Sequence, residues 1–152
     1  MKFLSFGGIA VREFESNPVV LYDGVCGLCN RAVRFLLERD RLDRLRFASL
    51  QSDFAATLLK RHGLDHKDLD TVYVVLNHGH ADEILLAKSD AILLLAKAIG
   101  GVWNFARLGK IIPRPIRNWL YDFIARHRYQ VFGKYESCML PDPRHQHKFI
   151  EV

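Results

Sequence analysis

The chain has 152 residues, of which 49% are hydrophobic and 26% charged, so its size and composition are typical of one globular domain and exclude a disordered chain. Three cysteines are too few for a disulfide-rich scaffold, and no apolar run reaches the roughly 20 residues of a transmembrane helix. We expect residues 1–17 to form an N-terminal extension rather than a signal peptide, because no convincing cleavage site follows the short apolar run. A cytoplasmic, thiol-reducing location is therefore expected.

The net charge of +5 is unevenly distributed along the chain. Between Trp103 and Lys134, seven Lys or Arg residues stand against one acidic residue, Asp122. The remainder of the chain is close to neutral, so we expect any anionic partner to meet the C-terminal third.

The first half of the chain alternates between strand and helix patterns. Continuous apolar residues in 18–24 predict a buried strand, and the helical periodicity of 26–40 predicts a helix directly after it. A second strand is predicted at 44–50 and a second helix at 51–63, with Ser52 as its N-cap.

The second half begins with a hairpin pattern over 71–89, whose turn is at 77–79. Either Ser89 or Asp90 is predicted to cap the next helix, which ends at the glycine pair 100–101.

A further helical region is predicted from about Trp103 to Arg128, and Pro113 and Pro115 divide it into two helices. The tail, 142–152, is polar and predicted to be irregular. A strand–helix–strand unit followed by a hairpin and a helix is the order of a thioredoxin-like α/β fold. We therefore expect one domain over 18–141, with a four-stranded mixed sheet flanked by helices and additional C-terminal helices.

Two cysteines, Cys26 and Cys29, fall where the first strand passes into the first helix. Unpaired amide N–H groups and the helix dipole favour a thiolate at such a position. We expect Cys26 to be the more exposed and more readily ionised sulfur, and Cys29 the more buried one. Cys26 would then attack a substrate disulfide as the nucleophile, and Cys29 would resolve the mixed disulfide.

Two other interpretations of these cysteines remain open. They could be inert, or they could bind a structural zinc ion together with Cys138 and either His145 or His147. The long separation between the two ligand groups weighs against zinc. No motif indicates a cofactor.

The residues also resemble a known family. The stretches "YDGVCGLCNRAVRFLLERD", "RLRFASLQS" and "RYQVFGKYESCMLP" are similar to the DCC family of thiol–disulfide oxidoreductases, named for an Asp-x-x-Cys-x-x-Cys motif that is Asp23, Cys26 and Cys29 here. The resemblance spans roughly 18–141. It implies a thioredoxin-like fold and a redox-active Cys-x-x-Cys pair acting on a protein or small-molecule disulfide or dithiol.

Asp23 has two possible roles. Its carboxylate could move protons during exchange, as a general acid and base, or it could cap the amides of its own turn. Cys138 could be a third redox partner or a buried small side chain.

The chain also departs from thioredoxin-like enzymes. They usually carry a cis-proline before the third strand, and Thr71 stands at that place here, so the backbone that docks the substrate is not assigned.

The C-terminal helical region combines an apolar helical face with a basic one. The apolar face comprises Ile116, Trp119, Leu120, Phe123 and Ile124, and the basic side comprises Arg117, Arg126 and Arg128. The apolar face could pack on the sheet and leave a solvated basic side, or the surface could bind anionic lipid headgroups or an acidic partner. The latter defines the alternative function, a non-enzymatic binding module. Nucleic acid is a weaker option, because no nucleic-acid motif is present.

Overall fold

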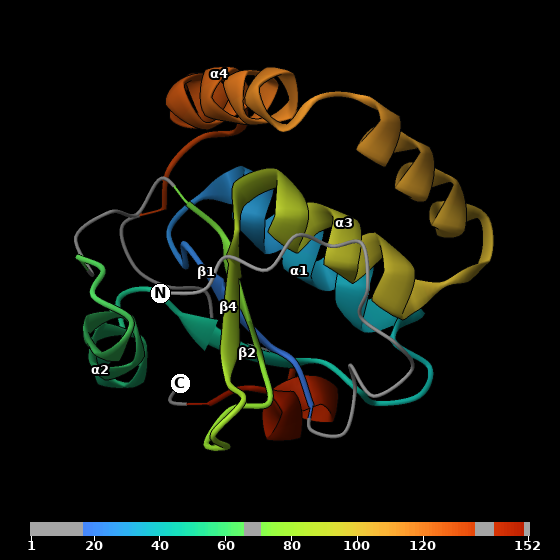
Figure 1. Cartoon of the computed structure of the whole chain (residues 1–152). Helices are drawn as coiled ribbons and strands as arrows, with labels where there is room; N and C mark the ends of the chain where they lie inside the picture. Colours follow the sequence, from blue (N-terminus) through green and yellow to red (C-terminus); the bar gives the residue numbers. More distant parts are fainter. Residues whose placement is uncertain (1–16, 66–70, 136–141, 151–152) are drawn as a thin grey trace.

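The computed structural model describes residues 17–65, 71–135 and 142–150. Its first half contains, in order, strand β1 (Val19–Tyr22), helix α1 (Gly27–Arg39), strand β2 (Arg46–Ser49) and helix α2 (Asp53–Arg61) (Figure 1). Each lies within the range predicted from the sequence, and the Ser52 side chain caps α2 by accepting a hydrogen bond from the Ala55 amide.

The second half contains a hairpin and a series of helices. These are β3 (Tyr73–Leu76), β4 (Ile84–Ala87), α3 (Lys88–Ile99), the 3-10 helix η2 (Gly101–Ile111), α4 (Arg114–Phe132) and the 3-10 helix η3 (Pro143–Lys148). The break between η2 and α4 falls at Pro113, as the sequence predicts.

The four strands form one mixed sheet in the order β2-β1-β3-β4. Strand β1 pairs in parallel with β2 and antiparallel with β3, and β3 pairs antiparallel with β4. The central strand β1 is buried along its whole length, which explains its continuous apolar sequence. The thioredoxin-like fold expected from the sequence is confirmed.

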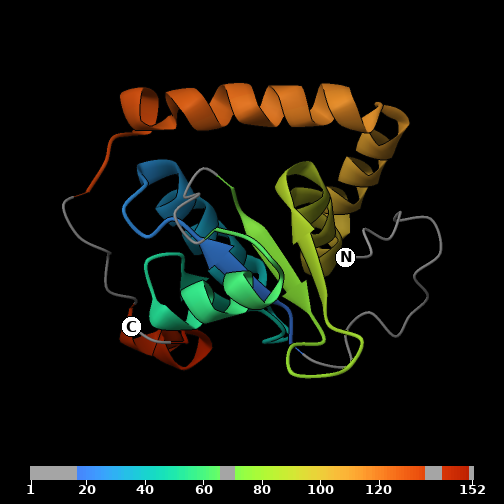
Figure 2. The same ribbon diagram turned by 60° about the vertical axis from the view of Figure 1, so that its left-hand side comes forward.

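Helices cover both faces of the sheet (Figures 1 and 2). Val20 and Tyr22 of β1 pack toward α1 and α3, whereas Val19 and Leu21 belong to the core cluster under α2. This alternation follows from the two-residue period of a strand. It fixes the end of β1, and the loop that follows it, between two packed layers.

The predicted cap of α3 is wrong. The N-cap residue is Ala87, without a side-chain hydrogen bond, so Ser89 and Asp90 lie inside the first turn. Their side chains bind α4 instead: the Ser89 hydroxyl donates to the Asn118 side-chain oxygen Oδ1 at 2.6 Å, and Asp90 pairs with Arg117 at 3.4 Å. Tertiary partners have replaced the local capping bonds.

The polar tail, predicted to be irregular, forms η3 and packs against the sheet. Lys148 is buried, and its Nζ lies 3.0 Å from the Asp40 carboxylate. The Phe149 ring stacks on Phe47 with centroids 5.5 Å apart, and the Ile150 amide donates to the Phe47 carbonyl at 2.8 Å. An aromatic anchor and a buried ion pair therefore hold this end of the chain.

Helix α4 lies across α1 and α3 (Figure 2), and two of its arginines, Arg117 and Arg128, reach inward to ion pairs. Arg117 and Arg128, predicted to lie on a solvated side, are instead mostly buried, whereas Arg126 is exposed. The apolar side faces outward, and its exposed residues are Ile116, Trp119, Leu120, Phe123 and Ile124. The alternative in which this apolar face packs on the sheet is wrong: Arg117 and Arg128 make ion pairs on the inner side of α4, and of the apolar face only Leu120 and Ile124 reach the edge of the space beneath it.

Within the described residues, no helix combines the length and apolar character needed to cross a membrane.

Candidate functional site

The structure places Cys26 at the N-cap of α1, directly after the loop that leaves β1. Its backbone is extended, and its Sγ accepts a hydrogen bond from the Cys29 amide at 3.5 Å. The Cys26 carbonyl accepts the first helical bond, from the Asn30 amide at 3.0 Å. A sulfur at this position receives both an unpaired amide and the positive end of the helix dipole, which together favour a thiolate.

The prediction that Cys26 is the more exposed cysteine is wrong. Cys26 is 0% exposed and Cys29 is 7% exposed. The chain after α4 covers Cys26: the Gly27 amide donates to the Gly133 carbonyl at 3.1 Å, and the Tyr135 amide to the Val25 carbonyl at 2.7 Å. This cover comes from more than a hundred residues along the chain, so local sequence patterns do not reveal it.

The two thiols are free and interact with each other. Burial raises the pKa of Cys29 to about 12, and negative charge on Cys26 and a hydrogen bond with it act in the same direction. The Arg128 guanidinium and a backbone hydrogen bond with Asp23 oppose this rise. At neutral pH, Cys29 therefore keeps its proton.

Asp23 is 1% exposed and lies at the centre of a hydrogen-bond network. Its carboxylate accepts from the Val25 amide at 3.1 Å, from Gln51 Nε2 at 2.7 Å, from Arg128 Nη2 at 3.0 Å and from the Tyr129 hydroxyl. The bond to an amide two residues ahead is the turn-capping role considered from the sequence. These contacts fix the loop that carries Cys26; a role in proton transfer stays a prediction.

Sequence reasoning missed Arg128 as a site residue. Its side chain is 3% exposed, pairs with Asp23 and exerts its charge on both cysteines. Together with Tyr129 it begins the "RYQVFG" stretch on which the family resemblance rests, so the two motifs meet in space. The place of Arg128 and Tyr129 in this second family motif was the sequence signal that could have identified them as site residues.

Helix α4 also contacts the start of β3, where thioredoxin-like enzymes carry their proline. Thr71 is buried there, and the amide of the next residue, Val72, donates to the Tyr121 hydroxyl at 2.8 Å. Burial raises the pKa of Tyr121 to about 12. A side chain of the protein itself therefore occupies this backbone donor.

An apolar cavity of about 490 Å³ lies between α1, α3 and α4, and Cys29 forms part of its wall. The cavity is bounded by Leu28, Ala32, Leu36, Ile92, Leu93, Leu120, Ile124 and Ala125, among others. Its polar wall residues include Ser89, Arg117 and Arg128.

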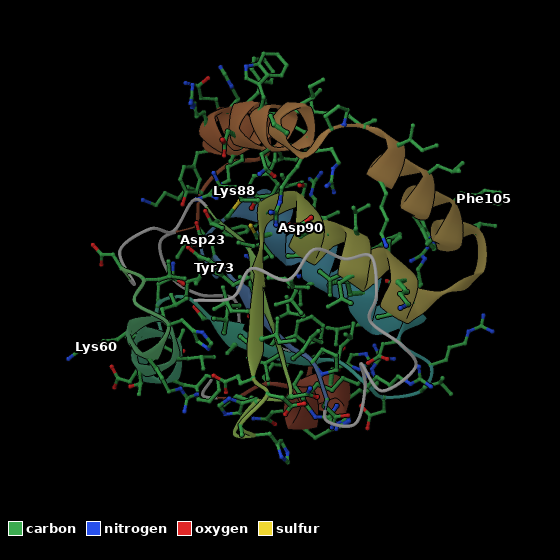
Figure 3. All side chains as sticks on the ribbon, viewed as in Figure 1. Asp23, Lys60, Tyr73, Lys88, Asp90 and Phe105 are labelled. Atoms are coloured by element: carbon green, nitrogen blue, oxygen red, sulfur yellow. The ribbon has the colours of Figure 1, made fainter. Side chains whose placement is uncertain are left out.

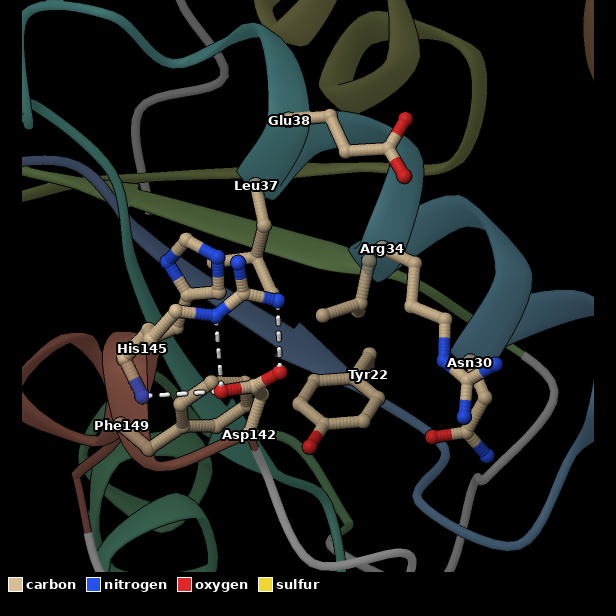
Figure 4. Close-up of a pocket in the computed structure, with 10 residues that line it drawn as sticks. Tyr22, Asn30, Arg34, Leu37, Glu38, Asp142, His145 and Phe149 are labelled. Atoms are coloured by element: carbon tan, nitrogen blue, oxygen red, sulfur yellow. Dashed lines mark hydrogen bonds and ion pairs between the residues drawn. The ribbon is translucent and has the colours of Figure 1, made fainter.

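A second, more polar pocket of about 320 Å³ lies on α1, against the C-terminal tail (Figure 4). Arg34 and Glu38 of α1 line it together with His145 and the Asp142–Arg144 ion pair. Neither Cys26 nor Cys29 lines this pocket.

The zinc alternative gains no support from the described residues. Among them, no group of three or more His, Cys, Asp or Glu side chains is arranged to hold a metal ion. Cys138 lies outside the described residues, so its proposed roles stay predictions. His147 is exposed and lies 3.4 Å from Asp43, and His145 lines the polar pocket.

Comparison with known proteins agrees with this arrangement. A family model described as DCC1-like thiol-disulfide oxidoreductase matches residues 20–134. The chain belongs to this family. The matched region begins in β1 and ends just beyond α4, so it includes Asp23, both cysteines and the Arg128–Tyr129 pair.

Two relatives extend the match. The uncharacterized protein YuxK of Bacillus subtilis is 39% identical over 134 residues, covering 88% of this chain and 94% of the relative. A chloroplastic DCC family protein of Arabidopsis thaliana is 36% identical over 129 residues, covering 84% of this chain and 72% of the relative. No solved structure matches. Membership of the DCC1-like family supports a general role in thiol–disulfide oxidoreduction.

Proposed function

We propose that the protein exchanges dithiols and disulfides through the Cys26–Cys29 pair. The observation that carries this proposal is the position of Cys26 as N-cap of α1, with its sulfur bonded to the Cys29 amide. The Arg128 charge acts on both sulfurs and adds to the stabilisation of a thiolate.

In the proposed reaction, Cys26 attacks first. As the sequence predicts, its thiolate attacks one sulfur of a substrate disulfide, and the other substrate sulfur leaves as a thiolate. Cys29 transfers its proton to that leaving thiolate and then attacks the Cys26 sulfur of the mixed disulfide. The second substrate sulfur leaves, so the substrate gains two electrons and the protein forms one disulfide.

Attack by Cys26 requires the chain after α4 to separate from the loop 25–27, because this segment covers the sulfur. Trapping with a small disulfide reagent tests the order of attack in Cys26→Ser and Cys29→Ser. If Cys26 attacks first, Cys29→Ser forms the mixed disulfide faster than Cys26→Ser. The opposite order would assign the first attack to Cys29.

The exchange itself is tested by measuring the reduction potential of the pair in glutathione buffers. We expect one intramolecular disulfide in the wild type and in the control Cys138→Ser, and none in Cys26→Ser or Cys29→Ser. If no such disulfide forms across the range of cytosolic potentials, the proposed function is wrong. The substrate is a protein or small-molecule disulfide or dithiol, and a cytoplasmic location stays a prediction.

A second candidate function, attachment to an anionic membrane surface, is favoured by the outward apolar side of α4. The 3-10 helix η2 exposes apolar side chains as well, and Phe105 points away from the body of the protein (Figure 3). The η2–α4 apolar surface comprises Val102, Trp103, Phe105, Leu108, Ile111, Ile116, Trp119, Leu120, Phe123 and Ile124. Apolar side chains with nearby basic residues are the combination that binds an anionic lipid interface.

Vesicle binding tests this candidate, because Trp103 and Trp119 are the chain's two tryptophans and both belong to the surface. We expect blue-shifted fluorescence and co-sedimentation with vesicles containing phosphatidylglycerol, weakened in Arg126→Glu and unchanged in the control Arg41→Glu, which lies outside α4. Binding should persist in Cys26→Ser. Absence of vesicle binding would contradict the membrane candidate and leave an acidic protein partner as the alternative.

A further inference from the structure

The cavity beneath α4 gives the redox pair an apolar approach. Its volume of about 490 Å³ lies within the range of about 300–1,000 Å³ found for small-molecule sites. Leu120 and Ile124 of α4 and Ile92 of α3 line it and are also exposed, so they form its rim. The cavity therefore extends from the protein surface to Cys29.

The two cysteines differ in their relation to this cavity. Cys29 forms part of its wall, whereas the fully buried Cys26 is the N-cap of α1 and is covered by the chain after α4. In an oxidised Cys26–Cys29 disulfide, a thiol in the cavity would meet Cys29 first. Cys26 would then leave, and the Cys29 amide and the Arg128 charge would stabilise it as a thiolate.

A folded protein substrate reaches Cys29 through this cavity less readily than a small molecule does. The backbone amide of Val72, at the start of β3, is bonded to the Tyr121 hydroxyl of α4. Helix α4 is held in place by the Asp23–Arg128 and Asp90–Arg117 ion pairs. The opening that remains suits a small molecule.

We propose that the oxidised Cys26–Cys29 pair accepts electrons from a small apolar dithiol bound in the cavity between α1, α3 and α4. This inference rests on the proposed thiol–disulfide exchange and names its substrate class. An apolar wall favours a hydrocarbon-bearing substrate over a polar one, because a polar substrate would lose its hydrogen bonds to water and find few partners in the wall.

The reaction balances without a further reagent. One substrate thiolate attacks the Cys29 sulfur, the bond between the two protein sulfurs breaks, and Cys26 leaves as a thiolate. The second substrate thiol then attacks the substrate sulfur of the mixed disulfide and releases Cys29, which takes up a proton. The substrate loses two electrons and becomes a disulfide, and the protein becomes a dithiol. This path is that of dithiol oxidation in the cavity, whereas a substrate disulfide that reaches the uncovered Cys26 reacts in the order given under the proposed function.

The test uses the full-length, oxidised protein and two dithiols of contrasting polarity, dihydrolipoamide and dithiothreitol. Each rate is divided by the rate of the same dithiol with oxidised glutathione, which removes intrinsic reactivity. We expect the normalised rate to be at least about tenfold higher for dihydrolipoamide, the discrimination typical of a few apolar contacts.

Variants that fill the cavity provide the second arm. The two variants are Ala125→Leu on the α4 wall and Ala32→Leu on the exposed part of the α1 wall. Each should lower the rate of reaction with dihydrolipoamide by about tenfold. The rate with dithiothreitol and the reduction potential of the pair should stay unchanged. Ala56→Leu on α2, which does not line the cavity, is the matched control and should change neither rate.

Three outcomes separate the proposals. Equal normalised rates for the two dithiols would overturn the apolar-substrate inference while leaving the proposed exchange intact. The same follows if the cavity variants lower the rates with both dithiols by the same factor. Failure to form any Cys26–Cys29 disulfide would overturn the proposed function and this inference together. Displacement of the apolar dye N-phenyl-1-naphthylamine by lipoamide, in the wild type but not in Ala125→Leu, reports occupancy of the cavity independently of redox chemistry.

Discussion

Replacing Asp23 by Asn removes the charge at the centre of the site while keeping the shape of the side chain. The carboxylate accepts from four donors and pairs with Arg128 at 3.0 Å, with both side chains almost fully buried. In Asp23→Asn the Arg128 guanidinium keeps its charge in a buried place but loses its counter-ion.

The expected loss of stability is large. Two unit charges 3.0 Å apart attract by about 5.5 kcal/mol at an effective dielectric constant of about 20, before the cost of desolvation is subtracted. Removing one partner of a buried pair typically costs about 3–5 kcal/mol, because the remaining charge is uncompensated. We expect Asp23→Asn to lower the free energy of unfolding by that amount.

Urea unfolding at neutral pH, followed by circular dichroism, measures this change. Asp142→Asn is the matched control, because Asp142 pairs with Arg144 at the similar distance of 2.9 Å but on the exposed surface. Solvent screens that pair, so we expect no measurable change in its unfolding midpoint.

A double variant separates the lost charge pair from a general loss of packing. Combining Asp23→Asn with Arg128→Met leaves no uncompensated charge, so its cost should fall below the sum of the two single variants by about 1–3 kcal/mol. A cost below about 1 kcal/mol for Asp23→Asn, similar to an exposed pair, would refute the reasoning, as would additive costs in the double variant.

Two further predictions concern the cover of the site and the buried acids. A Cβ on Gly27 would lie 2.1 Å from the Phe132 carbonyl oxygen, so Gly27→Ala should displace the segment that covers Cys26 and speed alkylation of the reduced protein. The control Gly109→Ala, whose Cβ makes an ordinary contact, should not change the alkylation rate. Equal alkylation rates in the two variants would contradict the conclusion that this segment shields Cys26. Burial raises the pKa values of Cys29 and Tyr121 to about 12, so the unfolded chain loses these protons first and the free energy of unfolding should fall as pH rises from about 9 to 12. Urea titrations of the reduced protein across this range should show a shallower fall in Tyr121→Phe, and an unchanged slope would count against burial as the cause.

The sequence was sufficient to predict the central sheet because its signals are local and repeated. Four apolar residues of β1 bounded by Asp23-Gly24, and a helix capped by Ser52, are patterns that neighbouring residues determine. The cap of α3 was mispredicted because Ser89 and Asp90 bind α4, a partner that only the tertiary fold supplies.

The site was predictable in its position and less so in its accessibility. The spacing of Cys26 and Cys29 after a strand places them at a helix start, and the structure has them there. Their exposure depends on Gly133 and Tyr135, which reach the loop only after α4 has crossed the molecule. The sequence predicted Arg128 to be one of several solvated basic residues, because its partner Asp23 lies 105 residues earlier in the chain and no local pattern links them.

The unusual orientation of α4 follows from the same buried charge. Asp23 closes the loop that carries Cys26, and a carboxylate in this buried place needs a cation and further donors. Arg128 and Tyr129 supply them from α4, so this side of the helix must face inward. A helix has only one opposite side, and here that side carries Trp119 and Phe123. The apolar outer surface of α4 is thus coupled to the polar site beneath it: the contacts that hold the loop carrying Cys26 in place are the ones that turn Trp119 outward.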